Sequence, residues 1–577
     1  MNTDLIASIA AALLAGTLVG HQPMAPKRHD ILIQGGTIYD GTGGKPYVGD
    51  VVVDGDKISY VGPHRAVDAK HVIDARGEAV SPGFINMLSQ AQESLLVDGR
   101  AESDLFQGVT LEVTGEGTSM GPLSDAMAAQ EQGREGDIKY PITWRSLGGY
   151  LETLVHKGIS VNIASMVGAA TVREYVLGED DVQPTADQLR KMQALVQQAM
   201  LEGALGVSSA LIYVPGTFAK TPELAALATE AGKCGGIYIT HMRSEGDDIL
   251  GAIDETIAIA KASGAPAEIY HFKIAGKANW PKLQSAISKI EAARASGIRV
   301  TADMYPYKAA ATGFDASMPH WVLDGGLDAW IARMKNPEIR ARLVAEMRHP
   351  DYESALAAAG AEGTLLLGFK NPKLKVLAGK TLAEVAKMNE QSPEDTVIDL
   401  VIEDGSRIGV AYTLMSEENL RKEIVLPWMS FASDGAATAP EGVFLKSLEH
   451  PRAYGTFARV LAKYVREERL MTLADAIHRL AGLPAANLSL EGRGLLKAGY
   501  FADVVVFNPA TIQDHATYAE PHQLATGVRY VLVNGGVALK DGKATGAHTG
   551  RVVRGRGWNG DKNGGCRLSA RDWAWSW

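Results

Sequence analysis

Residues 237–273 place two histidines at the ends of two consecutive β-like runs, and this arrangement constrains the fold more than any other stretch of the chain. The first run, IYITH, ends on His241, and the second, EIYH, ends on His271. Residues 248–264 between them carry apolar side chains at helical spacing and end on a glycine. This order of strand, helix and strand predicts the βαβ unit of a parallel sheet.

The position of these histidines has a chemical consequence. In a (β/α)8 barrel the carboxyl ends of all strands meet at one rim, which carries the active site. His241 and His271 would therefore converge there, as the ligands of a first-row metal ion must. The alternative is that each imidazole is hydrogen-bonded at a loop edge without an ion. Because the pattern recurs on consecutive strands, we favour the metal site.

Changes of pattern along the chain indicate its domains. Both ends contain short β-like runs punctuated by Gly-Gly and Asp-Gly pairs, whereas the middle alternates apolar runs with helical patterns. We therefore predict an α/β fold, a (β/α)8 TIM barrel with a small β-sandwich built from both ends of the chain. The expected boundaries are an apolar segment over 1–27, the sandwich over 28–80 and 491–550, the barrel over 81–490, an insertion over the rim at about 316–423, and a loosely attached tail over 551–577.

Composition narrows the function and the location. The net charge of -10 and the absence of basic runs argue against a nucleic-acid partner. Cys234 and Cys566 are the only cysteines, too few for a disulfide framework or a cysteine-based zinc site. Residues 5–20 are apolar, about as long as a signal-peptide core and short for a membrane span, although no basic residue precedes them. We expect a periplasmic or secreted protein without a stable membrane span; the alternative is a cytoplasmic protein with a short helix there.

Two acidic residues also stand at predicted strand ends. Asp434 ends the run WMSFASD, and Glu116 ends a run in which Glu112 lies one layer deeper. A carboxylate beside a divalent metal can bind it, or take a proton from metal-bound water and pass it to a leaving amine. The alternatives are a turn role for Asp434 and a structural role for the two glutamates.

Cations and phenols accompany these groups. Lys273 follows His271 by two residues, and Arg243 follows His241 by two. Tyr305 closes the next predicted strand, and Tyr213 lies in the loop after a buried one. An ammonium or guanidinium at the rim can hold an anionic substrate group. Each of these residues alone is more often structural, but together they describe a rim with a metal, an acid, cations and phenols.

Longer motifs resemble the N-acyl-D-amino-acid deacylases (D-aminoacylases) of the amidohydrolase superfamily. They occur in family order between about residues 30 and 550: DILIQGGTIYDGTG, SPGFIN, GIYITHMRSEGD, IYHFKIAG, VTADMYPYKAAATG, GKTLAEVA, FASDGA, HPRAYGTFARVL and RGLLKAGYFADVVVFNP. The resemblance implies a (β/α)8 barrel with a small β-sandwich, and zinc-dependent hydrolysis of an amide.

The same resemblance implies roles for individual residues. His241 and His271 match the two barrel-strand zinc ligands, and Asp434 matches the acid that serves as general base and then as proton donor. Lys273 and Tyr305 match the pair that binds the substrate carboxylate. Two residues of the predicted insertion, Tyr412 and Met415, fall where the family lines its acyl pocket.

Two departures from the family pattern reduce the expected metal content. The family has a His-x-His pair where this chain has Leu88 and Gln90, and its cysteine ligand aligns with Gly117. Glu116, next to that glycine, can supply a carboxylate instead. We therefore expect one Zn²⁺ ion per chain, held by Glu116, His241 and His271, with Asp434 counted in the metal site beside an open position for water.

The expected function is hydrolysis of the amide bond of N-acyl amino acids, first of all N-acyl-D-amino acids, by metal-activated water with an aspartate base. One alternative is an amidohydrolase that acts on another amide, a dipeptide or a cyclic imide, because a fold does not fix a substrate. Another is a non-catalytic descendant that only binds a ligand. The expected partner is thus a small molecule, and nothing in the sequence selects an oligomeric state.

Overall fold

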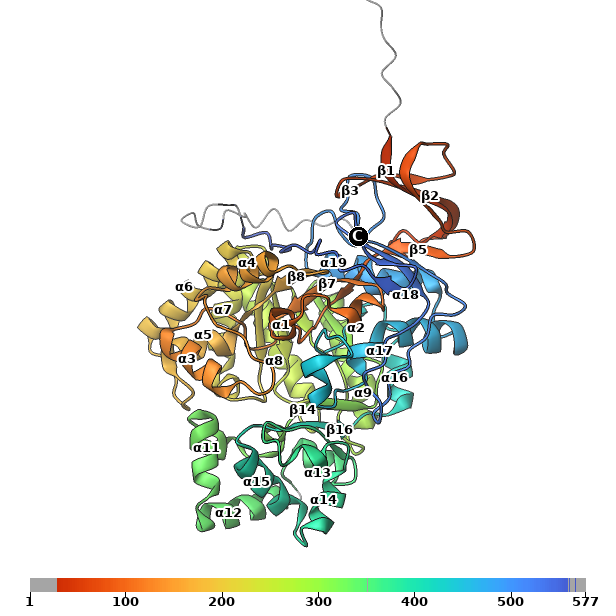
Figure 1. Cartoon of the computed structure of the whole chain (residues 1–577). Helices are drawn as coiled ribbons and strands as arrows, with labels where there is room; N and C mark the ends of the chain where they lie inside the picture. The colour runs from red at the N-terminus through yellow and green to blue at the C-terminus, as the bar shows by residue number, and fades with distance from the viewer. Residues whose placement is uncertain (1–27, 350, 559, 561–565, 567–577) are drawn as a thin grey trace, which may run out of the picture.

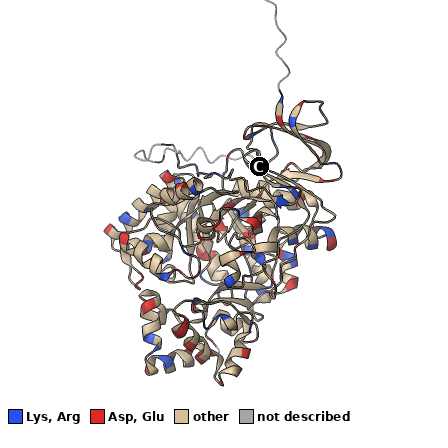
Figure 2. Cartoon of the chain, viewed as in Figure 1, with Lys and Arg blue, Asp and Glu red and all other residues tan. Residues whose placement is uncertain are grey.

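The computed structural model describes residues 28–349, 351–558, 560 and 566. The predicted apolar segment 1–27 lies outside the described residues. Within the described part of the chain, no helix combines the length and apolar character needed to cross a membrane. Acidic and basic residues are interspersed along the ribbon of the whole chain (Figure 2).

Strands from both ends of the chain share one sheet of nine strands, drawn in red and blue in Figure 1. The two halves join where β18 pairs antiparallel with β5, with Val505 opposite Ser81. β5 in turn pairs parallel with β1. The strands are β1 (His29–Ile38), β2 (Tyr47–Asp54), β3 (Lys57–Gly62), β4 (Ala69–Asp74), β5 (Ala79–Pro82), β18 (Val504–Phe507), β19 (Val528–Val533), β20 (Gly536–Lys540) and β21 (Lys543–Ala544).

The middle of the chain forms two parallel sheets, of three and six strands, in the orders β6-β7-β8 and β17-β13-β12-β11-β10-β9. The predicted unit of strand, helix and strand in residues 237–273 is present, because β11 pairs parallel with β12 across α8. The strands are β6 (Phe84–Asn86), β7 (Val109–Thr114), β8 (Asn162–Ser165), β9 (Val167–Gly168), β10 (Gly206–Ala210), β11 (Ile237–His241), β12 (Ala267–Ile269), β13 (Val300–Met304) and β17 (Met429–Phe431).

The hydrogen-bonded strands form two parallel sheets, and the closed (β/α)8 barrel stays a prediction. The mixed α/β character is as expected, since helices alternate with these strands along the chain. The helices of this part are α1 (Ser94–Val97), α2 (Glu102–Leu105), α3 (Asp125–Arg134), α4 (Leu147–Lys157), α5 (Ala169–Leu177), α6 (Ala186–Glu202), α7 (Thr221–Lys233), α8 (Ile249–Ser263), α9 (Leu283–Ala295), α16 (Glu417–Glu423), α17 (Arg452–Arg459), α18 (Leu473–Ile477) and α19 (Leu483–Asn487).

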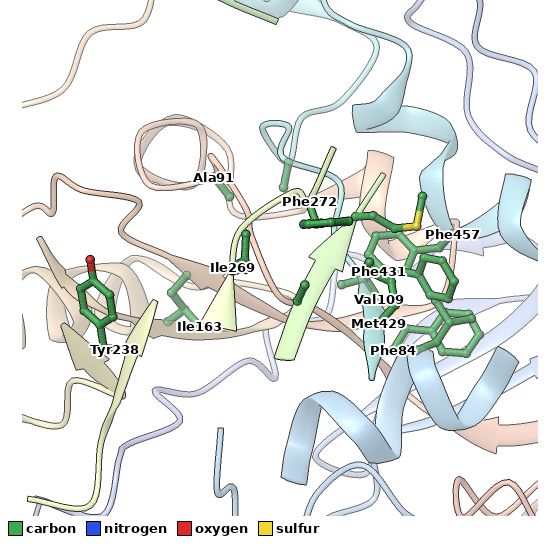
Figure 3. Close-up of a cluster of buried hydrophobic side chains, with 14 of the residues drawn as sticks. Phe84, Ala91, Val109, Ile163, Tyr238, Ile269, Phe272, Met429, Phe431 and Phe457 are labelled. Carbon is green, nitrogen blue, oxygen red and sulfur yellow. The ribbon is translucent and has the colours of Figure 1, made fainter. Parts of the chain in front are cut away.

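One apolar cluster connects the parallel sheets with the nine-stranded sheet. Phe84 of β6 packs against Phe457 of α17 and Phe507 of β18, with ring centroids 6.4 and 6.3 Å apart. Figure 3 shows Phe84, Phe457 and Phe431 gathered on one side of this cluster. All of these rings are fully buried, so their packing fixes the two parts of the molecule against each other.

Residues 305–415, between β13 and α16, form a separate unit with its own apolar core, drawn in green and teal in Figure 1. Its antiparallel sheet has the order β14-β16-β15. Its elements are β14 (Ala309–Gly313), α10 (His320–Leu323), α11 (Gly326–Met334), α12 (Pro337–Met347), α13 (Ala355–Ala359), β15 (Thr364–Gly368), α14 (Leu382–Met388), α15 (Pro393–Asp404) and β16 (Gly409–Thr413).

The expectation of a loosely attached tail is wrong for residues 551–558. Val552 forms a parallel bridge with Ile163 of β8, and the Ile163 backbone N–H donates to the carbonyl of Arg551 at 3.0 Å. Val553 is buried, and Cys566 forms a disulfide with Cys234 at the end of α7. Residues 551–558 lack periodicity because they pack through irregular backbone contacts, such as Gly555 N–H to the Gly203 carbonyl, and not as a regular helix or strand.

Candidate active site

Three side chains gather at the carboxyl ends of three parallel strands. Glu116 lies two residues beyond β7, His241 is the last residue of β11, and His271 lies two residues beyond β12. The Glu116 Oε1 atom is 3.0 Å from His241 Nδ1 and 2.9 Å from His271 Nε2. The candidate ligand atoms all lie within 4.8 Å of one another, and no other such group of His, Cys, Asp or Glu occurs in the described residues.

These distances suit a metal ion. Ligands that bind zinc tetrahedrally at about 2.0–2.2 Å stand a little over 3 Å apart, and two imidazoles with one carboxylate are a common ligand set. Burial alone would raise the pKa of Glu116, but hydrogen bonds from His241 and His271 outweigh it and hold that pKa well below its usual range. Glu116 is therefore a carboxylate, the form that binds a cation.

A second carboxylate, Glu245, lies behind the two histidines. Its Oε1 atom is 3.1 Å from His271 Nδ1 and 2.5 Å from Lys273 Nζ, and its Oε2 atom is 3.9 Å from His241 Nε2. Burial would raise the pKa of Glu245, but the charge of Lys273 and the two imidazoles hold it far below its usual range. Glu245 thus contacts both a candidate metal ligand, His271, and Lys273, the residue expected to bind the substrate carboxylate.

Asp434 lies beside the three-residue group without belonging to it. Its Oδ2 atom pairs with Arg452 Nη1 at 2.9 Å, and its Oδ1 atom accepts from Gln90 Nε2 at 3.1 Å. The same Gln90 amide donates to Glu116 Oε2 at 2.8 Å, so it connects the two carboxylates. Burial raises the pKa of Asp434, although the Arg452 charge opposes this.

Two site residues have left-handed backbone, which costs energy and persists only where neighbours enforce it. His271 has φ +35°, and its N–H donates to Asp303 Oδ1 at 2.9 Å. Asp434 has φ +47°, and its N–H donates to the Leu88 carbonyl at 2.9 Å. Leu88 has no ligating side chain, yet its backbone fixes the position of the acid.

These groups line one cavity of about 1170 Å³ between the parallel strands and the insertion. Lys273, Tyr305, Tyr213, Tyr412 and Arg243 also line it. The lining within the described residues does not include the sixth expected substrate residue, Met415, which is buried in the apolar core of the insertion.

The expected substrate residues differ in how free their polar groups are. The Lys273 Nζ atom lies 5.8 Å from the Tyr305 ring centroid, so the two residues expected to bind the substrate carboxylate are neighbours. The hydroxyls of Tyr213 and Tyr412 are hydrogen-bonded to Thr312 and Ser317, both at 2.7 Å. Arg243 is engaged more fully: its guanidinium donates to Glu255 and to the carbonyls of Thr217 and Ala219.

Glu112 does not reach the rim, as expected from its deeper position. It is fully buried, and its Oε2 atom accepts from Asn86 Nδ2 at 2.9 Å. Burial raises the pKa of Glu112 to about 7. Its role is structural and not ligating.

Sequence reasoning assigned no role to Glu245, Gln90 or Arg452. Two signals were present, since Glu245 stands four residues after His241 and Arg452 belongs to the motif HPRAYGTFARVL. For Gln90 the sequence indicated only that a family histidine ligand is replaced by glutamine. Its bridging position depends on a contact with Asp434, 344 residues away, which no local pattern indicates.

Residues 71–539 match the model of the Amidohydrolase family, and the chain belongs to that family. The chain is 32% identical over 530 residues to the D-aminoacylase of Alcaligenes xylosoxydans xylosoxydans, covering 91% of this chain and 97% of that protein. The resemblance to D-aminoacylases drawn from the sequence is thereby confirmed, as is the prediction that the chain is an enzyme of the amidohydrolase type.

Two solved structures are similar over nearly their whole length. One describes the binuclear metal center of D-aminoacylase, with one-metal activation and second-metal attenuation; it has a TM-score of 0.77 and 33% identity, and covers 91% of this chain and 100% of its own. The other is the N-acyl-D-glutamate deacylase of Bordetella bronchiseptica, complexed with zinc and a phosphonate inhibitor; it has a TM-score of 0.75 and 28% identity, and covers 92% and 100%.

Proposed function

We propose that this chain is a metal-dependent hydrolase that cleaves the amide bond of N-acyl-D-amino acids. The observation that carries the proposal is the group of Glu116, His241 and His271. Its carboxylate stands 3.0 and 2.9 Å from the two imidazoles, in a cavity that also contains Asp434 and Lys273. The names of the similar proteins, a D-aminoacylase and an N-acyl-D-glutamate deacylase, support this substrate class.

We also propose that the two parallel sheets form one (β/α)8 barrel. Only Met166 separates β8 from β9, and a parallel bridge from Ser89 to Gly435 spans the gap between β6 and β17. A closed barrel would bring the site residues to one rim. We retain the expected boundaries, with the small domain over 28–80 and 491–550, the barrel over 81–490, the insertion at about 316–423 and the tail over 551–577.

Glu116, His241 and His271 would hold one zinc ion, which when bound acts as a Lewis acid and lowers the pKa of a nearby water. Asp434 accepts a proton from the attacking water and passes it to the nitrogen of the leaving amine. Its raised pKa suits the second of these steps. Gln90 and Arg452 hold the two Asp434 oxygens in place during both.

The charge of the site favours a substrate with one carboxylate. With both imidazoles neutral, as metal ligands are, the carboxylates of Glu116, Glu245 and Asp434 and the cations Lys273 and Arg452 sum to one negative charge. A divalent ion changes this to one positive charge, which an anionic substrate neutralises. The Lys273 ammonium and the Tyr305 hydroxyl are the proposed contacts for that carboxylate.

The walls of the cavity complete the substrate site. Tyr213 and Tyr412 line it with buried rings whose hydroxyls are already hydrogen-bonded, so they offer mainly apolar surface. Arg243 supports the wall through Glu255, and Met415 packs behind it. We place neither of these two in direct contact with substrate.

We propose a single ion per chain. In the family pattern two histidines stand where this chain has Leu88 and Gln90, and the Gln90 amide joins Glu116 to Asp434 directly. An amide donor in that position satisfies both carboxylates without a second cation. We further propose export to the periplasm or the medium, because disulfides such as Cys234–Cys566 persist in oxidising compartments.

Two measurements on protein purified without chelators test the proposal. Elemental analysis should give about one zinc per chain, and N-acetyl-D-amino acids should be hydrolysed faster than their L-enantiomers. Faster hydrolysis of L-enantiomers, dipeptides or cyclic imides would point to a different amidohydrolase. Absence of both metal and hydrolysis would leave a protein that only binds a ligand, and two ions per chain would contradict the single site.

A further inference from the structure

A histidine that binds a metal through one ring nitrogen carries its proton on the other nitrogen, and that N–H needs a hydrogen-bond acceptor. His271 faces Glu116 with Nε2, so the proposed metal role of that nitrogen leaves the proton on Nδ1. Two groups lie near Nδ1, Lys273 Nζ at 2.8 Å and Glu245 Oε1 at 3.1 Å. An ammonium has three donors and no acceptor, so only Glu245 can accept that proton.

The same carboxylate faces two further donors. Glu245 Oε1 also accepts from Lys273 Nζ at 2.5 Å. Its Oε2 atom stands 3.9 Å from His241 Nε2, a buried nitrogen that has no hydrogen-bond partner among the described residues. His241 faces Glu116 with Nδ1, so its proton belongs on Nε2, the nitrogen turned toward Glu245. One carboxylate thus contacts the His271 imidazole and the ammonium directly and faces the His241 imidazole at longer range.

The loop that carries Glu245 is fixed from two sides. The Ala275 backbone N–H donates to the Glu245 carbonyl at 2.7 Å, which attaches the loop to the segment after β12. On the other side, Glu353 of the insertion accepts from Ser244 Oγ and from the Asp247 N–H, both at 2.9 Å. A side chain held this way keeps its orientation before any ligand arrives, as a supporting carboxylate must.

We propose that Glu245 is a positioning residue that orients both histidine ligands and the Lys273 ammonium, and so couples the affinity for metal to the recognition of the substrate carboxylate. The proposal rests on the proposed function for the identity of the substrate. Its metal part does not, because zinc binding can be measured without turnover. Carboxylates that orient metal-bound imidazoles typically change metal affinity by about 10- to 100-fold when they are removed.

The test is Glu245→Gln, which keeps the size of the side chain and removes its charge. The zinc Kd of the chelator-stripped protein, measured by competition with a chromophoric chelator, should rise about 10- to 100-fold. At saturating zinc the KM for an N-acetyl-D-amino acid should rise as well, because Lys273 loses the negative charge that orients its ammonium. Lys273→Met should raise KM and leave the zinc Kd within about 3-fold of the original chain, since a supporting acceptor and not a neighbouring cation holds the imidazole.

The control is Glu223→Gln. Glu223 is also a buried carboxylate in an ion pair, 2.7 Å from Arg173, but it lies on α7 away from the cavity lining. Glu223→Gln should change the melting temperature without changing the zinc Kd. Equal losses of zinc affinity in both variants would overturn the proposal, because the effect would then come from general destabilisation.

Two further outcomes are decisive. If Glu245→Gln binds zinc as tightly as the original chain, the positioning role is refuted whatever the substrate. If Glu245→Gln does not fold, Glu245→Asp retains the charge and withdraws the carboxylate by one methylene, and it should weaken zinc in the same direction; unchanged affinity would refute the role. If no N-acyl amino acid is hydrolysed by the original chain, the proposed function fails while the zinc measurements still decide on Glu245.

Discussion

Replacing Asp434 by Asn separates catalysis from metal binding. The substitution keeps the shape of the side chain and an acceptor for Gln90, but it removes the proton acceptor. General-base catalysis contributes about 100- to 10,000-fold, so kcat/KM should fall by that factor, which corresponds to about 3–5 kcal/mol of activation free energy. Zinc content should stay near that of the original chain, because the group of three ligand residues does not include Asp434.

Stability should fall in the same variant for a separate reason. Arg452 and Asp434 side chains are only 5% and 8% exposed, and their pairing atoms lie 2.9 Å apart. Removing one partner of a buried pair costs about 3–5 kcal/mol because the other charge stays buried. Here we expect the lower part of that range, since Arg452 also lies 4.6 Å from the Tyr305 ring centroid and donates to the Ala311 carbonyl at 3.3 Å.

The assay combines elemental analysis, thermal melting and release of free amino acid from an N-acetyl-D-amino acid. The matched control is Asp514→Asn, which breaks the pair with Arg459 at 3.1 Å outside the cavity lining and should lower stability while activity stays within about 3-fold, the range for residues without a catalytic contact. Activity near that of the original chain in Asp434→Asn would refute the base. Loss of zinc from that variant would make Asp434 a ligand instead.

Three other changes test the metal count, the buried acid and the disulfide. The double variant Leu88→His, Gln90→His should bind a second zinc ion and lose activity as the zinc concentration is raised, whereas the original chain should do neither. Zinc content per chain and the hydrolysis rate at increasing zinc concentration test this. Burial raises the pKa of Glu112 from 4.5 to about 7, so folding binds a proton there and stability falls as pH rises between these values. At pH 8 the free energy of unfolding of Glu112→Gln should therefore exceed that of the original chain by at most about 3 kcal/mol, and its melting temperature should be higher. At pH 4.5 the two proteins should melt at about the same temperature. Equal melting temperatures at pH 8 would contradict the burial argument. Cys234→Ser should lower the free energy of unfolding by about 2–4 kcal/mol, and a reducing agent should lower the melting temperature of the original chain but not that of the variant.

Sequence periodicity indicated where the chemistry would gather. His241 and Asp434 were identified because each follows an apolar run whose other residues alternate or are wholly buried, the pattern of a strand that ends at a rim. Glu116 stands at the end of a predicted strand, next to the position where the family has its cysteine ligand. The structure brings its carboxylate to both histidines because Gly115 and Gly117, with φ +99° and +65°, turn the chain on either side of it.

The supporting contacts could not be predicted in the same way. Gln90 acts on Asp434 from 344 residues away, and Arg452 reaches Asp434 from the first turn of α17; neither contact follows from a spacing in the sequence. Residues 551–558 have no periodic signal either, because they are held by irregular contacts with β8 and the segment after α6. Periodicity records which face of an element is buried; it carries no information on which loops meet.

The pairing of β18 with β5 also sets an order of events during synthesis. The first five strands leave the ribosome early, but β5 lacks its antiparallel neighbour until residues 504–507 have been made, some 420 residues later. Until then the edge of β5 stays open to other chains, a known route to aggregation. We therefore expect truncated or stalled chains to aggregate through this edge, and the full-length chain to complete its small sheet only after its parallel sheets have formed.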